Sequence, residues 1–286
     1  MKNRHGEDVV FVIGSPRSGT TWLQRLLASH PLIETSQESN FFISYAKPLL
    51  KSWNDDVSDD SGRGGIGLPC YLSELEFYKL IRNLFYSAVV DKAIKTKVGA
   101  RIFLEKTPSH ALVVEEINRI LPHARFIFIV RDPRDVVSSI VAASKSWGKD
   151  WAPTTTLHAL AMWRRHVVKA RQGLSKLPKN LYITIRYEDL LEDAAETLKT
   201  VFHFLGIVID EEVIKSAIAE NSIDKIGGRS FHVRGEIALR AGEWISEPKG
   251  FVRSGKKGGW RNELGILRGW LIKFLVGKEM KRYRYD

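Results

Sequence analysis

The strongest constraint on this chain is the stretch VVFVIGSPRSGTTWLQRLLASH, residues 9–30. Its first five residues form an apolar, β-branched run typical of strands that are buried on both faces of a parallel sheet. The turn that follows cannot continue the strand, because Pro16 has no N–H group and the glycines allow positive φ angles. From Thr20 onward, apolar residues recur at helical spacing. The stretch therefore predicts a strand, a glycine-rich turn and a helix, whose free N–H groups bind anions.

This turn has the spacing of a nucleotide phosphate loop, with one substitution. Gly14 and Gly19 stand where G-x-x-x-x-G-K-[ST] has its glycines, but Thr20 occupies the lysine position and Thr21 follows it. The cation lies inside the turn instead, at Arg17, whose guanidinium can donate two charge-assisted hydrogen bonds to a phosphate or sulfate. The plainer alternative is a tight strand-to-helix turn with a capping threonine.

The sequence PRSGTTW, residues 16–22, resembles the 5′-phosphosulfate loop of sulfotransferases that use 3′-phosphoadenosine 5′-phosphosulfate (PAPS). An arginine at position 17 resembles the tyrosylprotein branch and some glycan and bacterial branches, whereas the small-molecule branch usually has lysine. The resemblance implies an α/β, P-loop-like three-layer fold with a central parallel β-sheet flanked by helices. It also implies donor binding by Arg17, Ser18, Gly19, Thr20, Thr21 and Trp22.

A second signal lies around residues 125–139. An apolar strand is predicted over 125–130, Arg131 leaves its carboxyl end, and Ser139 follows two helical turns later. Ligands of open α/β sheets bind at this edge. The resemblance makes Arg131 and Ser139 the 3′-phosphate site. Without it, an arginine paired with an acid at a strand end would be the plainer reading.

The third signal is FVRSGKKGGWRNELG, residues 251–265. It resembles the family segment that closes over the 3′-phosphate, which implies roles for Arg253, Ser254 and Gly255. Ser254 replaces the commoner lysine, and Lys256 or Lys257 can supply the charge. Earlier in the chain, Tyr-Glu-Asp-Leu follows a predicted strand over 180–186, and the resemblance places Tyr187 in the adenine pocket. Asn221 departs from the family pattern and is left out of the predicted site.

Two further segments suggest the catalytic groups. Glu38 lies 21 positions after Arg17, the offset of the catalytic base in the tyrosylprotein branch, and a carboxylate suits proton removal from an acceptor hydroxyl. A surface glutamate is the alternative. The sequence EKTP resembles the segment whose lysine, here Lys106, contacts the leaving phosphate or sulfuryl oxygens. Arg17 shares this charge stabilisation, and His110 is the second candidate for the base. The histidines show no metal-ligand spacing, so no metal is expected.

Bulk properties favour one domain over residues 1–286. The net charge of +11 fits a polyanionic donor, an anionic membrane surface or nucleic acid. No apolar run approaches the roughly 18 residues that span a bilayer, there is one cysteine, and the N-terminus is polar. These features predict a cytoplasmic protein. The expected partner is a small-molecule, lipid or glycan hydroxyl acceptor and not nucleic acid, and the oligomeric state is left open.

Two regions are assigned less specific roles. Residues 41–90 are rich in aromatics and are predicted to form the acceptor pocket, with a mobile loop over 54–69. Residues 266–285 predict a basic amphipathic helix with Trp270, Leu271, Phe274 and Leu275 on one side. Packing of that side onto the domain is the favoured interpretation, and contact with a membrane surface is the alternative.

Together these signals predict a PAPS-dependent sulfotransferase that acts by positioning and electrostatic stabilisation. A P-loop kinase is the alternative enzyme. It would need the missing lysine and an acidic Mg²⁺ ligand, for which Asp132 is the nearby candidate. A nucleic-acid or membrane-surface binder would explain the positive charge, and its affinity would fall steeply with salt.

Overall fold

The computed structural model describes residues 4–58, 67–222, 225, 230–232, 244–246, 251 and 255–285. The chain divides into two compact units. Unit 1 comprises Met1–Gly14, Pro31–Phe128 and Val168–Ile183, and unit 2 comprises Ser15–His30, Ile129–Val167 and Thr184–Asp286.

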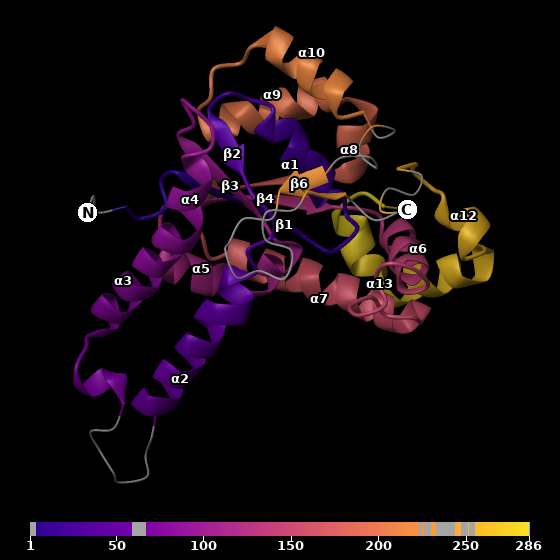
Figure 1. Cartoon of the computed structure of the whole chain (residues 1–286). Helices are drawn as coiled ribbons and strands as arrows, with labels where there is room; N and C mark the ends of the chain where they lie inside the picture. The colour runs from indigo at the N-terminus through magenta and orange to yellow at the C-terminus, as the bar shows by residue number, and fades with distance from the viewer. Residues whose placement is uncertain are drawn as a thin grey trace. The chain divides into compact units, whose positions relative to one another are not determined.

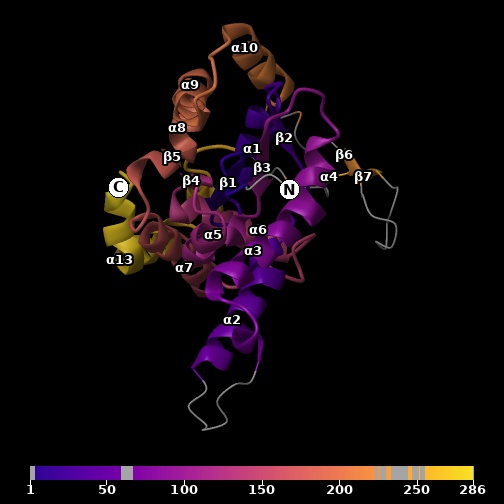
Figure 2. The same ribbon diagram turned by 90° about the vertical axis from the view of Figure 1, so that its left-hand side faces the viewer.

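The central sheet has five parallel strands in the order β2-β3-β1-β4-β5 (Figures 1 and 2). In register, Val12 of β1 lies opposite Lys106 of β3, and Ile33 of β2 lies opposite Ile102. Every residue of β1 and β3 is buried, as expected for strands covered on both faces. The predicted fold class is confirmed, and so are the predicted first strand and the strand over 125–130. The strands are β1 (Val9–Gly14), β2 (Ile33–Thr35), β3 (Ile102–Lys106), β4 (Arg125–Val130) and β5 (Tyr182–Arg186).

Unit 1 has an aromatic core built on β1. The ring of Phe11 contacts Phe42, Phe85 and Phe126 at centroid distances of 5.4–6.3 Å. Two of its helices, α2 and α3, run side by side (Figures 1 and 2), and Trp53 stacks on Phe77 between them. The helical segments are η1 (Phe42–Ala46), α2 (Lys47–Val57), η2 (Leu68–Cys70), α3 (Glu74–Phe85), η3 (Tyr86–Val90), α4 (Asp91–Ile94), η4 (Pro108–Leu112), α5 (Val114–Ile120) and η5 (Lys179–Leu181).

The loop predicted over 54–69 is corrected at both ends. Residues 54–57 complete α2, and Leu68–Cys70 form a short 3₁₀ turn. The apolar side of α2 supplies the reason, since Leu50 and Trp53 are buried and hold its last turns. The middle of the predicted loop, residues 59–66, lies outside the described residues.

Unit 2 is mainly helical. Its α6 begins with Asp132, whose carboxylate accepts a hydrogen bond from the Arg134 N–H, and with Pro133 in the first turn. The helix α7 (Thr156–Leu174) begins in unit 2 and ends in unit 1. A short antiparallel pair joins β6 (Ser230–His232) and β7 (Trp244–Ser246). The other helices are α1 (Thr20–Ala28), α6 (Pro133–Ser144), α8 (Tyr187–Glu192), α9 (Ala194–Leu205), α10 (Glu211–Glu220), α12 (Trp260–Glu263) and α13 (Ile266–Arg282).

The last helix, α13, packs with the opposite side from the one predicted. The buried residues are Gly269, Ile272, Val276 and Met280, whereas Trp270 and Phe274 remain 67% and 86% exposed. The prediction was wrong because the helix has two apolar sides, and the sequence does not show which one is covered. Gly269 allows this side of α13 to be the buried one, because its backbone lies against the ring of Trp260, where a larger residue would not fit. None of the described helices has the length and apolarity needed to cross a membrane.

Candidate active site

The glycine-rich turn after β1 has two left-handed residues. Arg17 has φ 71° and Gly19 has φ 93°, and the Ser18 N–H donates to the Ser15 carbonyl at 3.1 Å. A positive φ in a non-glycine residue is strained, and such strain concentrates at ligand-binding turns. A Cβ at Gly19 would lie 2.4 Å from the ring of Tyr187, so only glycine fits there. The turn therefore delivers free N–H groups at the start of α1.

Arg17 is held by groups from other parts of unit 2. Its Nε donates to the Ser139 hydroxyl at 3.0 Å, and its Nη2 donates to the Phe251 carbonyl. The guanidinium also lies over the rings of Trp147 and Phe251, about 5 Å from each centroid. Two residues of the predicted donor site, Arg17 and Ser139, are thus brought into direct contact.

Arg131 is placed by backbone carbonyls and a ring. Its Nη groups donate to the carbonyls of Arg17 at 3.2 Å and Lys256 at 3.3 Å, and its guanidinium lies 4.2 Å above the centre of the Tyr187 ring. The Tyr187 hydroxyl in turn donates to the Gly255 carbonyl at 2.7 Å. The loop, Arg131, Tyr187 and Gly255 therefore form one connected cluster.

Two buried polar atoms of this cluster lack a hydrogen-bond partner among the described residues. They are the Ser18 hydroxyl oxygen and the Arg131 Nε. Buried polar groups are normally paired, because an unpaired one loses its hydration without compensation. A hydroxyl and a guanidinium N–H both suit phosphate oxygens as partners. The residues present therefore fit a nucleotide that carries anionic groups.

Three other predicted donor residues lie in the first turn of α1. Thr20 is buried in the first turn of α1, and Thr21 is partly buried beside it. The Trp22 ring meets the Tyr187 ring edge-on, at a centroid distance of 5.8 Å. Arg253 and Ser254 lie outside the described residues.

Sequence reasoning missed three residues that shape this cluster. Trp147 belongs to no recognised motif, and no sequence signal pointed to it. Asn221 was set aside, yet its carbonyl accepts from the Trp22 Nε1 at 2.9 Å and its amide donates to Ser29. Asp135 accepts from the backbone N–H groups of Gly258 and Trp260 at 2.8 and 2.9 Å, which anchors the basic segment. Its position in the motif RDPRD was the available signal.

In unit 1, Glu38 and Lys106 form an ion pair. The Lys106 Nζ donates to a Glu38 carboxylate oxygen at 2.5 Å. The Lys106 side chain is only 7% exposed, whereas that of Glu38 is 42% exposed. Lys106 is the last residue of β3, so its position is fixed by the sheet. The pair combines an accessible carboxylate with a fixed cation, which can accept a proton and stabilise negative charge respectively.

Glu105, which precedes Lys106, organises the surrounding backbone. Its Oε1 accepts from the Thr107 hydroxyl at 2.6 Å and the Ser39 hydroxyl at 3.0 Å. Burial raises the pKa of Glu105 to about 7, although these hydrogen bonds and Lys106 oppose the shift. Ser39 follows Glu38 directly, so this network ties the Glu38 segment to the end of β3. The motif EKTP, which contains Glu105, predicted no role for this residue.

His110 is enclosed by the core of unit 1. It is completely buried, its Nε2 accepts from the Phe42 N–H at 3.4 Å, and its ring packs edge-on against Phe11. Burial lowers its pKa to about 3, so the ring is neutral near pH 7. An acceptor hydroxyl cannot reach a side chain without exposed surface, which favours Glu38 over His110 as the base.

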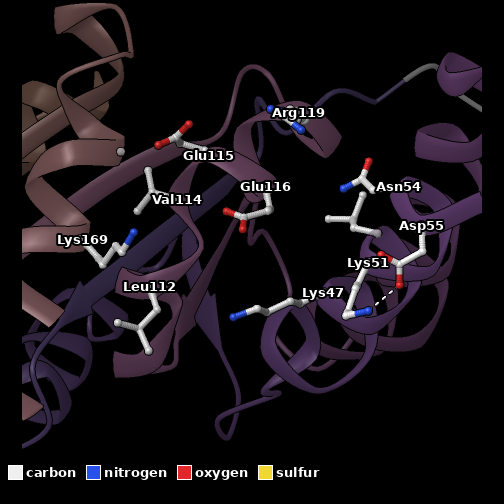
Figure 3. Close-up of a pocket in the computed structure, with 12 residues that line it drawn as sticks. Lys47, Lys51, Asn54, Asp55, Leu112, Val114, Glu115, Glu116, Arg119 and Lys169 are labelled. Atoms are coloured by element: carbon white, nitrogen blue, oxygen red, sulfur yellow. Dashed lines mark hydrogen bonds and ion pairs between the residues drawn. The ribbon is translucent and has the colours of Figure 1, made fainter. Parts of the chain in front are cut away.

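Unit 1 also contains a cavity of about 400 Å³ (Figure 3). Its apolar floor comes from Leu50, Leu112 and Val114. Figure 3 shows Lys47 and Lys169 reaching toward the cavity from opposite sides, and neither has an ion-pair partner within the described part of the chain. The other charged residues of the wall include the ion pair Lys51–Asp55 and Glu115, which pairs with Lys176. The cavity can hold a partly apolar molecule with an anionic group.

A parallel α/β sheet with a phosphate-type loop after its first strand is typical of nucleotide-binding proteins of the P-loop-like class. Comparison with known proteins identifies the class more closely. The model of the family described as "Sulfotransferase family" matches residues 9–211. The chain therefore belongs to the sulfotransferase family. By this family match it is an enzyme of the sulfotransferase family, and the matches do not favour the kinase alternative.

Individual relatives are distant. Protein-tyrosine sulfotransferase 1 of Danio rerio is 23% identical over 223 residues, which cover 78% of this chain and 59% of that protein. A mouse sulfotransferase complexed with PAP, 3′,5′-ADP, shares the fold with a TM-score of 0.60 at 16% identity, covering 97% and 86% of the two chains. A sulfotransferase domain from the curacin biosynthetic pathway has a TM-score of 0.56 at 17% identity and covers 99% of each chain.

Proposed function

We propose that this chain transfers the sulfuryl group of PAPS to a hydroxyl acceptor and releases 3′,5′-ADP, without a metal ion. The observation that carries the proposal is the arginine cluster of unit 2, in which Arg17 and Arg131 meet around the loop and leave two buried polar atoms for a ligand. Two separate guanidinium groups suit a nucleotide with two separate anionic groups better than one with a single polyphosphate chain.

In this proposal Arg17 and the loop N–H groups hold the 5′-phosphosulfate end of the donor. Arg131, Ser139 and the segment around Gly255 hold the 3′-phosphate, with Arg253 and Ser254 as its remaining predicted contacts. Trp22 and Tyr187 bind the adenine. The contacts of Arg17 with Ser139 and of Arg131 with Tyr187 support the binding roles of the two cations, because they hold both guanidinium groups in place before a ligand arrives.

The chemical step forms an acceptor oxygen–sulfur bond and breaks the sulfur–oxygen bond to the 5′-phosphate. Glu38 takes the proton of the acceptor hydroxyl, and Lys106 and Arg17 stabilise charge on the sulfuryl and leaving-group oxygens. The exposure of Glu38 and the burial of Lys106 support these roles. Fixed cations need no reorganisation as charge develops, so positioning and electrostatics carry the rate.

The acid that a kinase would need as its Mg²⁺ ligand, Asp132, is already engaged by an arginine. Asp132, the acid nearest to the donor motifs, is buried, and both of its carboxylate oxygens accept hydrogen bonds from Arg134 at 2.7–3.1 Å. Its Oδ1 also caps α6. An oxygen engaged by a guanidinium is a poor Mg²⁺ ligand, because the metal ion would have to displace a positive charge already in place.

The acceptor is a hydroxyl compound. Tyrosine is one candidate, because the relative from Danio rerio is named as a protein-tyrosine sulfotransferase. The cavity between α2, α5 and α7 is the proposed site for the acceptor or for part of it. Five of its lining residues come from the region 41–90 that the sequence assigned to acceptor binding. Its two unpaired lysines favour an acceptor with an acidic substituent.

A transfer assay tests this function. The chain is incubated with PAPS labelled in its sulfuryl group and with a tyrosine-containing peptide, a simple phenol or a long-chain alcohol, and labelled product and 3′,5′-ADP are measured together. We expect equal amounts of both with at least one acceptor. Transfer of a γ-phosphate from ATP to the same acceptors, with none from PAPS, would contradict the proposal.

A further inference from the structure

The C-terminal helix α13 carries a stripe of large apolar side chains that face solvent. Leu267 and Phe274 are 87% and 86% exposed, Trp270 is 67% exposed, and Leu271 is 42% exposed. Their spacing of three and four residues places them on one side of the helix. Burial of the opposite side leaves this stripe without a cover among the described residues. Contiguous exposed apolar surface of this kind marks an interaction site.

Basic side chains surround the stripe. At about 100° per residue, Arg268 lies on one flank of it and Lys273 on the other, and both are exposed. Three more exposed cations, Lys278, Lys281 and Arg282, follow beyond a kink at Val276, where the backbone angles are not helical. The single acid of the helix, Glu279, forms an ion pair with Arg164, in which its carboxylate oxygen lies 3.8 Å from the Arg164 Nε. The solvent side is therefore apolar along its centre and positively charged at its edges and C-terminal end.

This pattern selects among the surfaces that could cover the stripe. A second copy of the chain meeting it face to face would bring five cations of each helix together, with one acid per helix to offset them. Nucleic acid would match the cations but leave Leu267 and Phe274 in water. An anionic bilayer surface meets both requirements, because acyl chains accept the apolar stripe while phosphate headgroups meet its flanks.

We propose that α13 binds in the plane of an anionic phospholipid surface, with Leu267, Trp270, Leu271 and Phe274 inserted below the headgroups. In this orientation α13 lies along the surface and does not span the bilayer. Apolar insertion and headgroup attraction each supply part of the binding, so removal of either weakens it. The proposal concerns a helix surface that plays no part in the proposed transfer reaction, and it stands or falls independently of that reaction.

Vesicle co-sedimentation tests the proposal on the whole chain. Phosphatidylcholine vesicles are compared with vesicles of phosphatidylcholine and phosphatidylglycerol, and the wild type with the double variant Leu267→Ser/Phe274→Ser. The matched control is Val98→Ser/Val208→Ser, which changes two equally exposed apolar residues, 101% and 85%, outside the helix. Thermal unfolding of all three proteins shows whether each variant folds, and little change is expected because the altered side chains touch little protein.

The wild type and the control should sediment with the anionic vesicles and far less with phosphatidylcholine alone. The partition coefficient of the helix variant for the anionic vesicles should fall about tenfold or more. The variant Arg268→Gln/Lys273→Gln should lose most of the preference for the anionic lipid. Trp270 should report insertion through a blue shift of emission that Trp270→Phe abolishes. Equal sedimentation of wild type and helix variant would overturn the proposal. So would a wild-type dimer that the helix variant dissociates while neither protein binds vesicles.

Discussion

The glycine-rich loop and the end of β3 both follow buried strands, but they are shaped in different ways. The loop obtains its form within five residues, from the positive φ angles of Arg17 and Gly19 and a hydrogen bond between Ser18 and Ser15. The end of β3 obtains its form over long sequence distances, from Glu105 to Ser39 and from Lys106 to Glu38, 66 and 68 positions apart. Local backbone geometry shapes the turn of the proposed donor site, although contacts with Ser139 and Phe251 also hold the Arg17 side chain. A side-chain network positions the proposed catalytic pair.

The substitution Glu38→Gln should affect catalysis at the end of β3 and leave nucleotide binding at the glycine-rich loop unchanged. Without the carboxylate no side chain removes the acceptor proton, so kcat should fall about 10²–10⁴-fold. The affinity for 3′,5′-ADP should not change, because Glu38 takes no part in the donor cluster. Rates are measured with saturating PAPS, and Glu192→Gln, a glutamate of α8, is the control. A kcat within about twofold of wild type would exclude Glu38 as the base.

Gly19→Ala should damage the loop by two separate effects. The new Cβ would lie 2.4 Å from the Tyr187 ring, and the positive φ would be strained. Affinity for 3′,5′-ADP should fall about 100-fold or more, since both the loop and the proposed adenine pocket are displaced. Gly206→Ala isolates the strain, because Gly206 has φ 66° but open space around it. That control should lose about 1 kcal/mol of stability and keep its affinity. Equal affinity losses would refute the steric argument.

Arg131→Ala tests the division of the donor into two anionic ends. Loss of a hydrogen-bonded charge costs about 1.5–3 kcal/mol, so the Kd for 3′,5′-ADP should rise about 10–150-fold. The Kd for 5′-AMP, which lacks the 3′-phosphate, should change much less. Arg165→Ala, an exposed arginine of α7, is the control, and titration calorimetry provides the comparison. An equal loss of affinity for both nucleotides would mean that Arg131 does not bind the 3′-phosphate.

Glu105→Gln should show how the network responds to pH. In the folded chain the pKa of Glu105 is about 7, raised from 4.5 by burial, so the folded state holds its proton more tightly than the unfolded state. Its contribution to stability is complete below about pH 4.5 and is lost as pH rises through about 7. The free energy of unfolding of wild type should therefore fall relative to the variant by roughly 2–3 kcal/mol between pH 4.5 and 8. Urea unfolding at both pH values measures this, and a difference independent of pH would contradict the assigned burial effect.

The same contrast explains how much could be predicted from the sequence. The strand before the loop and the strand over 125–130 followed from compact motifs, because spacing along the chain fixes local geometry. The contact of Arg17 with Ser139, which lie 122 positions apart, was not predicted. The roles of Asn221 and Glu105 were not predicted either, because they depend on contacts with distant residues. The packing side of α13 was predicted wrongly, since both sides are apolar and Gly269 against Trp260 decides between them. The predicted roles of the site residues remain predictions.

Thermal unfolding with 3′,5′-ADP, ADP and ATP at equal concentration tests the proposed donor most directly. A ligand at 100 times its Kd adds about 2.7 kcal/mol to the free energy of unfolding, which for a chain of this size raises Tm by several degrees. The proposal predicts a shift with 3′,5′-ADP, a much smaller one with ADP or ATP, and loss of the shift in Arg131→Ala. A shift with ATP and none with 3′,5′-ADP would contradict it.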